Sequence, residues 1–277
     1  MEKSRTAEDF SDIGVSRIFL DESISRAYAQ HRHCYTEEVF QIISDYCREN
    51  LPELNLAIDV GCGPGNSTVG FTKHFKQVIG VDMSEAQIAQ APKNIPNCQF
   101  KLGFATNLDF LEPCSVDLVA CGMAINLISK PAFYREADRV LKPGGTFAVF
   151  GYGAPFCANK QMDDIFKWVY DVAKSHVGEE LREVAEKYPG LELPYPGWIK
   201  NEDVLITTEG TPEEYMELVN ILNQAMIHCG YRDESFLETV KKRMAEVREV
   251  LREGTGSDVR NCQMFFPAVI YLAHKPF

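Results

Sequence analysis

Short apolar runs alternate with amphipathic stretches along the first half of the chain. Five short segments are expected to be strands: 56–60, 78–82, 98–102, 116–121 and 146–151. Between the runs, Ser84 and Gln87 form a capping box that begins a helix, and Pro131 suits the first turn of another helix. The alternation predicts an α/β fold in which helices cover both faces of a mostly parallel sheet.

The regions that flank this alternation have a more helical pattern. A helix is expected to begin at Thr36 and to end before Leu51, which precedes a proline. Beyond residue 151, the spacing of apolar residues predicts helices near 165–172 and 237–251. Further helices are expected at 178–187 and from a start at Thr211. Two more strands are expected at 203–208 and 265–273.

The order of these elements predicts a single domain over residues 1–277. Its core is expected at 50–151 and 202–277. The N-terminal helices at 16–49 and an insertion at 152–201 are expected to form a substrate cap. We place this cap over the carboxyl ends of the strands, because open α/β sheets bind their ligands at that edge.

The junction between the first predicted strand and the next helix contains three glycines. Gly61, Gly63 and Gly65 directly follow the apolar run 56–60. Glycine is needed where the backbone adopts unusual dihedral angles or lies close to a ligand. The second strand ends at Asp82, and an acid at such a strand end can accept hydrogen bonds from ribose hydroxyls. These features predict a site for a cofactor that contains a nucleoside.

The glycine spacing argues against two other nucleotide sites. The dinucleotide fingerprint Gly-x-Gly-x-x-Gly would need its third glycine at the position of Asn66. A phosphate-binding P-loop would need a lysine after the glycines, and none follows them. An NAD-dependent oxidoreductase is therefore a disfavoured alternative.

The segment resembles the first motif of the class I S-adenosylmethionine-dependent methyltransferases, acid-x-Gly-x-Gly-x-Gly, with Asp59 as the acid. Asp82 is similar to the acid that holds the ribose hydroxyls in that family, and residues 141–145 resemble the turn before its fifth strand. The resemblance spans about 28–151 and implies S-adenosylmethionine as the cofactor. It further implies a Rossmann-like, seven-stranded sheet with an antiparallel last strand, and contact between Asp59 and the cofactor's amino group.

Recognition of the adenine ring departs from the family pattern. Residues 103–105 align with a family segment that often reads Gly-Asp-Ala, but Phe104 replaces the aspartate that accepts the adenine amino proton. The backbone around Phe104 and Ala105 is still expected to contact the ring. We also expect Met83 and Met123, which follow the second and fourth predicted strands, to contact the cofactor.

An N-terminal element resembles one branch of the family, the small-molecule methyltransferases similar to fungal trans-aconitate methyltransferase. Tyr28, Arg32 and Tyr35 match the aromatic and basic positions of its Tyr-x-x-x-Arg-Pro-x-Tyr element, whereas His33 replaces the proline. In that branch the element folds over the cofactor, which implies that Tyr28 and Arg32 bind it. The guanidinium of Arg32 can form a forked pair with a carboxylate of the cofactor or of the substrate.

The sequence leaves the catalytic residues unassigned. Residues 124–126 read Ala-Ile-Asn where the branch usually has Ala-His-Trp, so the histidine expected at the methyl-transfer centre is missing. A carboxylate acceptor needs no base, whereas an amine must first lose a proton. We therefore expect transfer to a carboxylate or another oxygen of a small molecule. An N-methyltransferase of a small amine and a non-catalytic cofactor-binding protein are the alternatives.

An apolar pocket would favour such a transfer, because it excludes water from the reacting groups. Four large side chains are candidates to line it: Met123, Tyr152, Tyr195 and Trp198. Composition agrees with a small-molecule substrate, since the formal net charge of −12 disfavours nucleic acid and anionic membranes as partners. We expect a monomer.

The number and spacing of the cysteines bear on metal binding and on the cellular compartment. None of the nine forms a Cys-x-x-Cys pair, so the sequence predicts no metal site. The odd number of cysteines and the absence of a recognisable signal peptide favour a reducing environment, and we expect the protein to be cytoplasmic. The longest strongly apolar stretch, 118–128, is too short to span a membrane.

Overall fold

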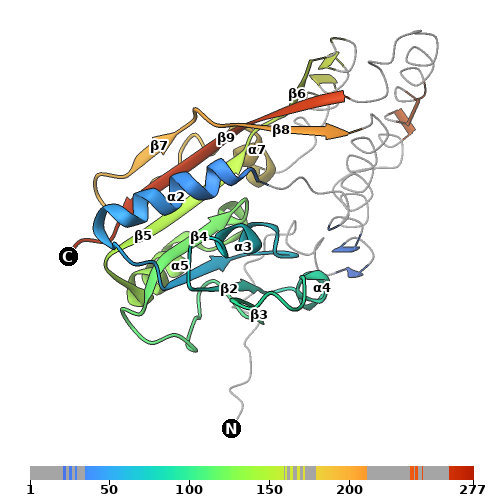
Figure 1. Ribbon diagram of the computed structural model, residues 1–277. Helices are drawn as coiled ribbons and strands as arrows, with labels where there is room; N and C mark the ends of the chain where they lie inside the picture. The colour runs from blue at the N-terminus through green and yellow to red at the C-terminus, as the bar shows by residue number, and fades with distance from the viewer. Residues whose placement is uncertain are drawn as a thin grey trace.

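The structure is a computed structural model in which residues 35–158, 179–210 and 262–277 are described, together with single residues or pairs within 21–29, 160–171 and 238–245. This part of the chain forms a mixed sheet with helices on both of its faces (Figure 1). The sheet has nine strands: β1 (Leu56–Val60), β2 (Gln77–Asp82), β3 (Cys98–Leu102), β4 (Val116–Gly122), β5 (Leu141–Tyr152), β6 (Phe156–Cys157), β7 (Ile199–Asn201), β8 (Leu205–Gly210) and β9 (Cys262–His274).

The described helices lie between these strands. They are α2 (Glu37–Asn50), α3 (Asn66–Phe71), α4 (Glu85–Gln90), the 3-10 helix η3 (Ile125–Leu127), α5 (Lys130–Val140) and α7 (Glu179–Ala185). The predicted helix starts at Thr36 and Ser84 are confirmed, since these two residues are the N-caps of α2 and α4. Pro131 lies in the first turn of α5, as predicted.

Strand order confirms the predicted α/β, Rossmann-like fold. Strands β3-β2-β1-β4-β5 are parallel neighbours, and β9 joins β5 in the antiparallel direction. Seven of the strands have five or more residues, and the short β6 and β7 are additional partners of β9. Strands β1 to β3 are added toward one edge of the sheet, whereas β4 and β5 are added toward the other, so the order of the strands switches between β1 and β4. Open α/β sheets bind ligands at such a switch point.

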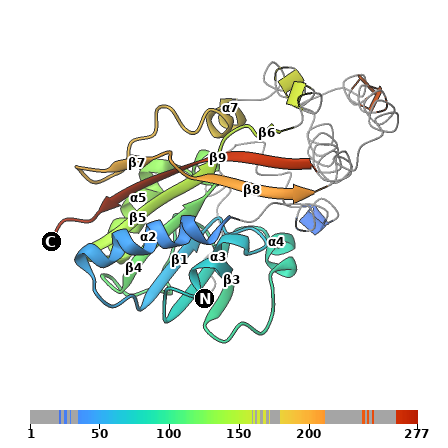
Figure 2. The same ribbon diagram turned by 45° about the horizontal axis from the view of Figure 1, so that its top comes forward.

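Two hydrophobic cores cover the two faces of the sheet. On one face, α2 and α3 pack through Val39, Ile43 and Phe71 against strand residues that include Leu118 and Phe150. On the other face, α5 packs together with residues 188–195 against the alternate side chains of the same strands. Figure 2 shows α2 and α3 in front of the strands and α5 behind them. Burial on both faces is the reason why strands such as β1 and β4 read as nearly continuous apolar runs.

Several boundaries differ from the sequence prediction. Residues 141–145, expected as a turn, already belong to β5, because Leu141 pairs with Val116 before a register shift in β4. Strand β8 begins two residues later than expected, at Leu205. The predicted helices at 165–172 and 237–251 fall largely outside the described residues, and so does the predicted helix start at Thr211.

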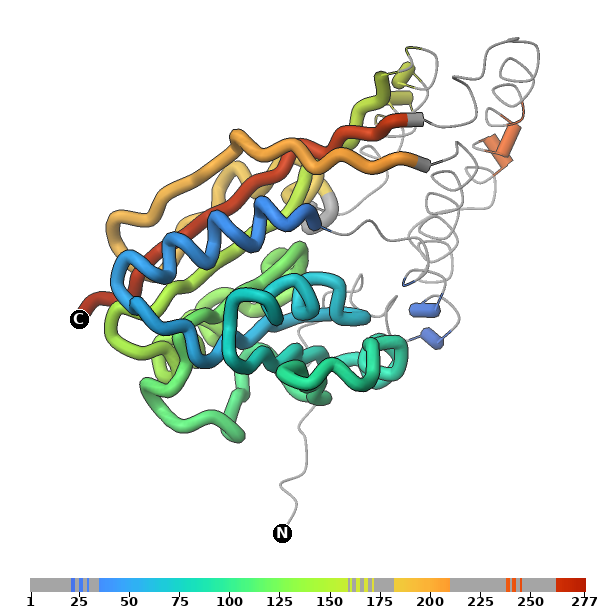
Figure 3. Tube along the Cα trace, viewed as in Figure 1, coloured from blue at the N-terminus to red at the C-terminus, as the bar shows by residue number. Residues whose placement is uncertain are grey.

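The predicted cap is described only in part. α2, which the sequence places in the cap, packs on a face of the sheet and follows β5 and β9 in the traces of Figures 1 and 3. Residues 188–195 of the insertion likewise pack on the opposite face. Most of residues 16–34 and of 159–178 lie outside the described part, so a cap over the strand ends stays a prediction.

Candidate functional site

The loop after β1 is held against the end of β2. The N–H groups of Gly61 and Cys62 donate to the carbonyl of Val81 at 2.8 and 3.1 Å. Gly61 has a φ of +67°, and a Cβ on it would lie 2.5 Å from the Cβ of Ala124. Neither the backbone conformation nor the available space allows a side chain there. The loop therefore lies in the crevice between the ends of β1, β2 and β4.

Asp82, at the end of β2, bonds to the loops on both sides of it. Its Oδ2 accepts from the N–H of Gly63, and its Oδ1 accepts from the N–H of Ser84, both at 2.8 Å. Burial raises the pKa of the Asp82 carboxyl above its ordinary value, although the N–H bonds act in the opposite direction. A carboxylate has about four lone-pair positions, so these oxygens can still accept hydrogen bonds from a ligand.

Asp59 lies beneath the loop, not on the pocket surface. The residue is fully buried, and its Oδ2 accepts from the hydroxyls of Ser67 at 2.7 Å and Thr68 at 2.6 Å. These bonds attach the first turn of α3 to β1. Ser67 itself lines the pocket, so Asp59 fixes the position of a lining residue.

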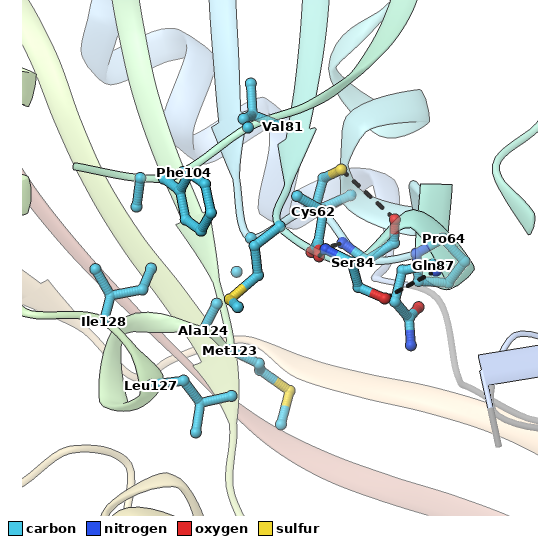
Figure 4. Close-up of a pocket in the computed structure, with 18 of the residues that line it drawn as sticks. Cys62, Pro64, Val81, Ser84, Gln87, Phe104, Met123, Ala124, Leu127 and Ile128 are labelled. Carbon is cyan, nitrogen blue, oxygen red and sulfur yellow. Dashed lines mark hydrogen bonds between the residues drawn. The ribbon is translucent and has the colours of Figure 1, made fainter. Parts of the chain in front are cut away.

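A pocket of about 500 Å³ opens above the ends of β1, β2 and β4. Figure 4 shows the side chains of Phe104, Leu127 and Ile128 on one side of it, and those of Ser84 and Gln87 on the other. The pocket thus has an apolar side and a polar side. Asp82 is the only Asp, Glu, His, Lys or Arg among the described residues that line it.

Most of the residues proposed from the sequence come together at this pocket. Seven line it: Gly61, Gly63, Asp82, Met83, Phe104, Ala105 and Met123. Gly65 and Asp59 are not lining residues, although Pro64 and Asn66 on either side of Gly65 are. Tyr28 and Arg32 lie outside the described residues.

Met123 has a strained backbone at the pocket wall. Its φ is +54°, which is uncommon for a residue with a side chain. Its N–H donates to the carbonyl of Phe150 at 2.9 Å, which fixes this conformation at the end of β4. Such strain is found mainly at functional sites, where the surrounding structure holds it in place.

Sequence reasoning missed several lining residues and misplaced three. Gln87 is recognisable only as part of a capping box and Ser67 carries no motif of its own, while Leu127, Ile128 and Ala132 reach the pocket only because η3 and α5 fold back over β4. The expectation that Tyr152, Tyr195 and Trp198 line the pocket is wrong. Tyr195 is buried with α5 and donates to Asp138 at 3.1 Å, while Trp198 packs against the ring of Tyr271.

Comparison with known proteins identifies the family. Residues 57–145 match the family described as "Methyltransferase domain". A methyltransferase of Dictyostelium discoideum is 28% identical over 91% of this chain and 94% of its own. The methyltransferase YcgJ of Bacillus subtilis is 31% identical over 61% of this chain and 71% of its own. The chain belongs to the S-adenosylmethionine-dependent methyltransferases.

A solved structure shows that the fold of this methyltransferase is shared. A type II methyltransferase from Anaeromyxobacter dehalogenans has a TM-score of 0.69 and 24% sequence identity, with coverage of 88% of this chain and 98% of the other. This likeness confirms the predicted fold. The predicted cofactor class is confirmed separately, by membership of the family. Within the part of the methyltransferase chain that the structure describes, no helix has the length and apolarity needed to cross a membrane.

The pocket suits S-adenosylmethionine in size and in chemistry. Its volume lies within the usual range for a small-molecule site. The carboxylate of Asp82 offers acceptors for hydroxyl groups, and the apolar side around Phe104 offers surface for an aromatic ring. Among the described residues, no cluster of metal-ligating side chains accompanies these groups.

Proposed function

We propose that this methyltransferase transfers the methyl group of S-adenosylmethionine to an oxygen atom of a small molecule, and that a carboxylate is the preferred acceptor. The observation that carries the proposal is the wall of the pocket: among the described residues that line it, Asp82 is the only acid, and none is a histidine or a lysine. Asp82 already accepts two backbone hydrogen bonds. The described wall therefore offers no free base, and a carboxylate needs none.

We assign the binding of the cofactor to residues on both sides of the pocket. Asp82 accepts from the ribose hydroxyls, the loop at Gly61 and Gly63 approaches the methionine moiety, and Phe104 with Ala105 contacts the adenine. Met83 and Met123 complete the contact surface. Asp59 acts through α3 and Ser67, which it holds in place. From the resemblance, Tyr28 and Arg32 are assigned to the same cofactor, and Gly65 to the loop that holds it.

The reaction asks the chain for positioning and for exclusion of water, not for proton transfer. S-adenosylmethionine supplies a methyl group on a sulfonium, and as the acceptor oxygen forms its bond to the methyl carbon, the S–C bond breaks and leaves a neutral thioether. The strained Met123 and the ring of Tyr35 stand at the pocket wall, where they can keep the acceptor close and water out.

We further propose that the chain belongs to the branch similar to fungal trans-aconitate methyltransferase and acts on a compact carboxylic acid. Tyr35, the last residue of the N-terminal element that carries this resemblance, supports the assignment because it lines the pocket. Its ring packs 4.8 Å from that of Phe150 and 5.8 Å from that of Tyr152, measured between centroids.

Methyl transfer from labelled S-adenosylmethionine to a panel of small acids and amines tests the proposal. We expect labelled ester products that alkali hydrolyses, with no product from amines. An Asp82→Ala variant should lose this activity through weaker cofactor binding. Product from amines alone would overturn the oxygen preference, and tight cofactor binding without transfer to any acceptor would support a non-catalytic protein instead.

A further inference from the structure

We propose that Gln87 is a further cofactor-binding residue, whose side-chain oxygen accepts a hydrogen bond from a sugar hydroxyl of S-adenosylmethionine. The inference rests on the cofactor site proposed above and adds a residue that no motif assigns to it. Gln87 lies in α4, lines the pocket and is only 2% exposed. A buried side-chain amide at a pocket wall has few hydrogen-bond partners within reach. The partner of each of its polar atoms therefore indicates the role of the residue.

The first observation is an incomplete capping box. In such a box, Ser84 would accept from the N–H of Gln87, and the Gln87 side chain would accept from the N–H of Ser84. The first bond is present at 3.2 Å. The second bond is absent because Oδ1 of Asp82 already takes the N–H of Ser84. Because Asp82 takes this N–H, the side-chain oxygen of Gln87 makes no bond within the capping box.

The second observation concerns the two polar atoms of this side-chain amide. Its Nε2 donates to the hydroxyl of the buried Ser25 at 3.2 Å. Its Oε1 is also buried and meets no hydrogen-bond partner among the described residues. The amide is thus held at its nitrogen end by Ser25, and its oxygen is left to accept a hydrogen bond in the pocket.

The third observation is the position of this oxygen. A Cβ built on Gly63 would lie 3.4 Å from Oε1, so the oxygen faces the glycine loop. The N–H of the same Gly63 donates to Oδ2 of Asp82. Gln87 and Asp82 therefore approach one loop residue from two directions. A ligand that offers hydroxyl donors to Asp82 has a neighbouring hydroxyl within reach of Gln87, as the vicinal hydroxyls of a ribose do.

Calorimetry with S-adenosylhomocysteine tests the role of Gln87. Gln87→Met keeps the length and helix propensity of the side chain but removes the acceptor. We expect this variant to bind roughly five- to tenfold more weakly, the effect of one neutral hydrogen bond. Gln90→Met, the same change on the same helix outside the pocket, should bind as the unchanged protein does.

Two further measurements identify the contact. With 2′,3′-dideoxy-S-adenosylhomocysteine, the unchanged protein and Gln87→Met should bind equally, since the hydroxyls are gone. Gln87→Glu, which retains an oxygen acceptor, should keep most of the affinity for S-adenosylhomocysteine. An equal loss with both ligands would place the contact away from the sugar and overturn the inference, as would unchanged affinity in Gln87→Met. A lack of binding by the unchanged protein would instead contradict the cofactor site itself.

Discussion

Two effects act in opposite directions on the ionisation of the Asp82 carboxyl. Burial raises the pKa of its carboxyl, whereas a role as acceptor for sugar hydroxyls needs the ionised form. The N–H groups of Gly63 and Ser84 supply part of the compensation in the free protein. Hydroxyl donors from a ligand would favour the carboxylate further, so binding should release a proton at acidic pH.

We therefore predict that affinity for S-adenosylhomocysteine falls as the pH is lowered toward the raised pKa of Asp82. The loss should begin above the ordinary aspartate value of 3.8, because the pKa of the free protein is raised and that of the complex is lower. In Asp82→Asn the affinity should be lower by about 1–3 kcal/mol at neutral pH and should lose this pH dependence.

Calorimetry between pH 4 and 8 provides the measurement, and Asp203→Asn, an exposed aspartate outside the pocket, is the control. Equal pH profiles for the unchanged protein and Asp82→Asn would contradict the assignment of Asp82 to the ligand.

Among single residues, the sequence identifies those whose role follows from their position relative to a predicted strand. Glycines after a strand and an acid at the end of the next strand can be recognised without a structure, and Gly61, Gly63 and Asp82 indeed meet at one pocket. Gln87 could not be recognised as a lining residue, because a capping box explains it equally well. Only the competition between Asp82 and Gln87 for one N–H shows that its side-chain oxygen makes no bond within the capping box.

At the scale of the strands, one buried carboxylate connects the beginnings of β1, β4 and β5. Asp117, 1% exposed, accepts from the N–H groups of Asn55 and Leu56 at 2.6 and 2.7 Å. Lys142 in β5 donates to its other oxygen at 2.6 Å. This ion pair gives the lysine of the 141–145 segment a structural role, far from the carboxyl ends where the pocket lies.

We predict that Lys142→Met lowers the free energy of unfolding by about 1–3 kcal/mol, because it leaves a buried carboxylate without its charge partner. Asp117→Ala should cost more, about 3–5 kcal/mol, since two backbone N–H groups lose their acceptor as well. Urea unfolding followed by circular dichroism measures both.

Lys76→Met is the matched control, because Lys76 pairs with Glu53 on the surface, where both side chains are largely exposed. Its effect should stay below about 0.5 kcal/mol. If Lys142→Met and Lys76→Met were equally mild, the buried pair would not stabilise the junction of these strands.

Strands in the middle of the sheet could be predicted because burial on both faces makes β1 and β4 nearly continuous apolar runs. The ranges 56–60 and 98–102 are correct to the residue. The start of β5 could not be predicted, since residues 141–145 look like a turn and become strand only through pairing with β4. Tyr195 was misplaced for a similar reason: an aromatic residue in a proline-rich loop packs equally well on a sheet face, and its partner Asp138 on α5 is distant in sequence.

For the molecule as a whole, the two cores determine which thiols solvent can reach. Cys47 lies in the core on one face of the sheet and Cys121 in the core on the other, and both are fully buried. Burial raises the pKa of the Cys47 thiol to about 12 and that of the Cys121 thiol further. Cys114, by contrast, is exposed in the loop before β4. A reagent that needs the thiolate should therefore distinguish them sharply.

We predict that iodoacetamide at pH 8 modifies Cys114 within minutes, while Cys47 and Cys121 react at least roughly 100-fold more slowly, because their modification requires opening of a core. Peptide mapping by mass spectrometry at successive times measures each site separately. In urea above the unfolding midpoint the three rates should converge, since Cys47 and Cys121 become exposed and the pKa values of these two thiols return to that of a free cysteine. Cys114→Ser should remove the fast reaction and leave the two slow rates unchanged. Fast modification of Cys121 in the native protein would show that solvent reaches the core between α5 and the sheet, and would contradict the packing on that face.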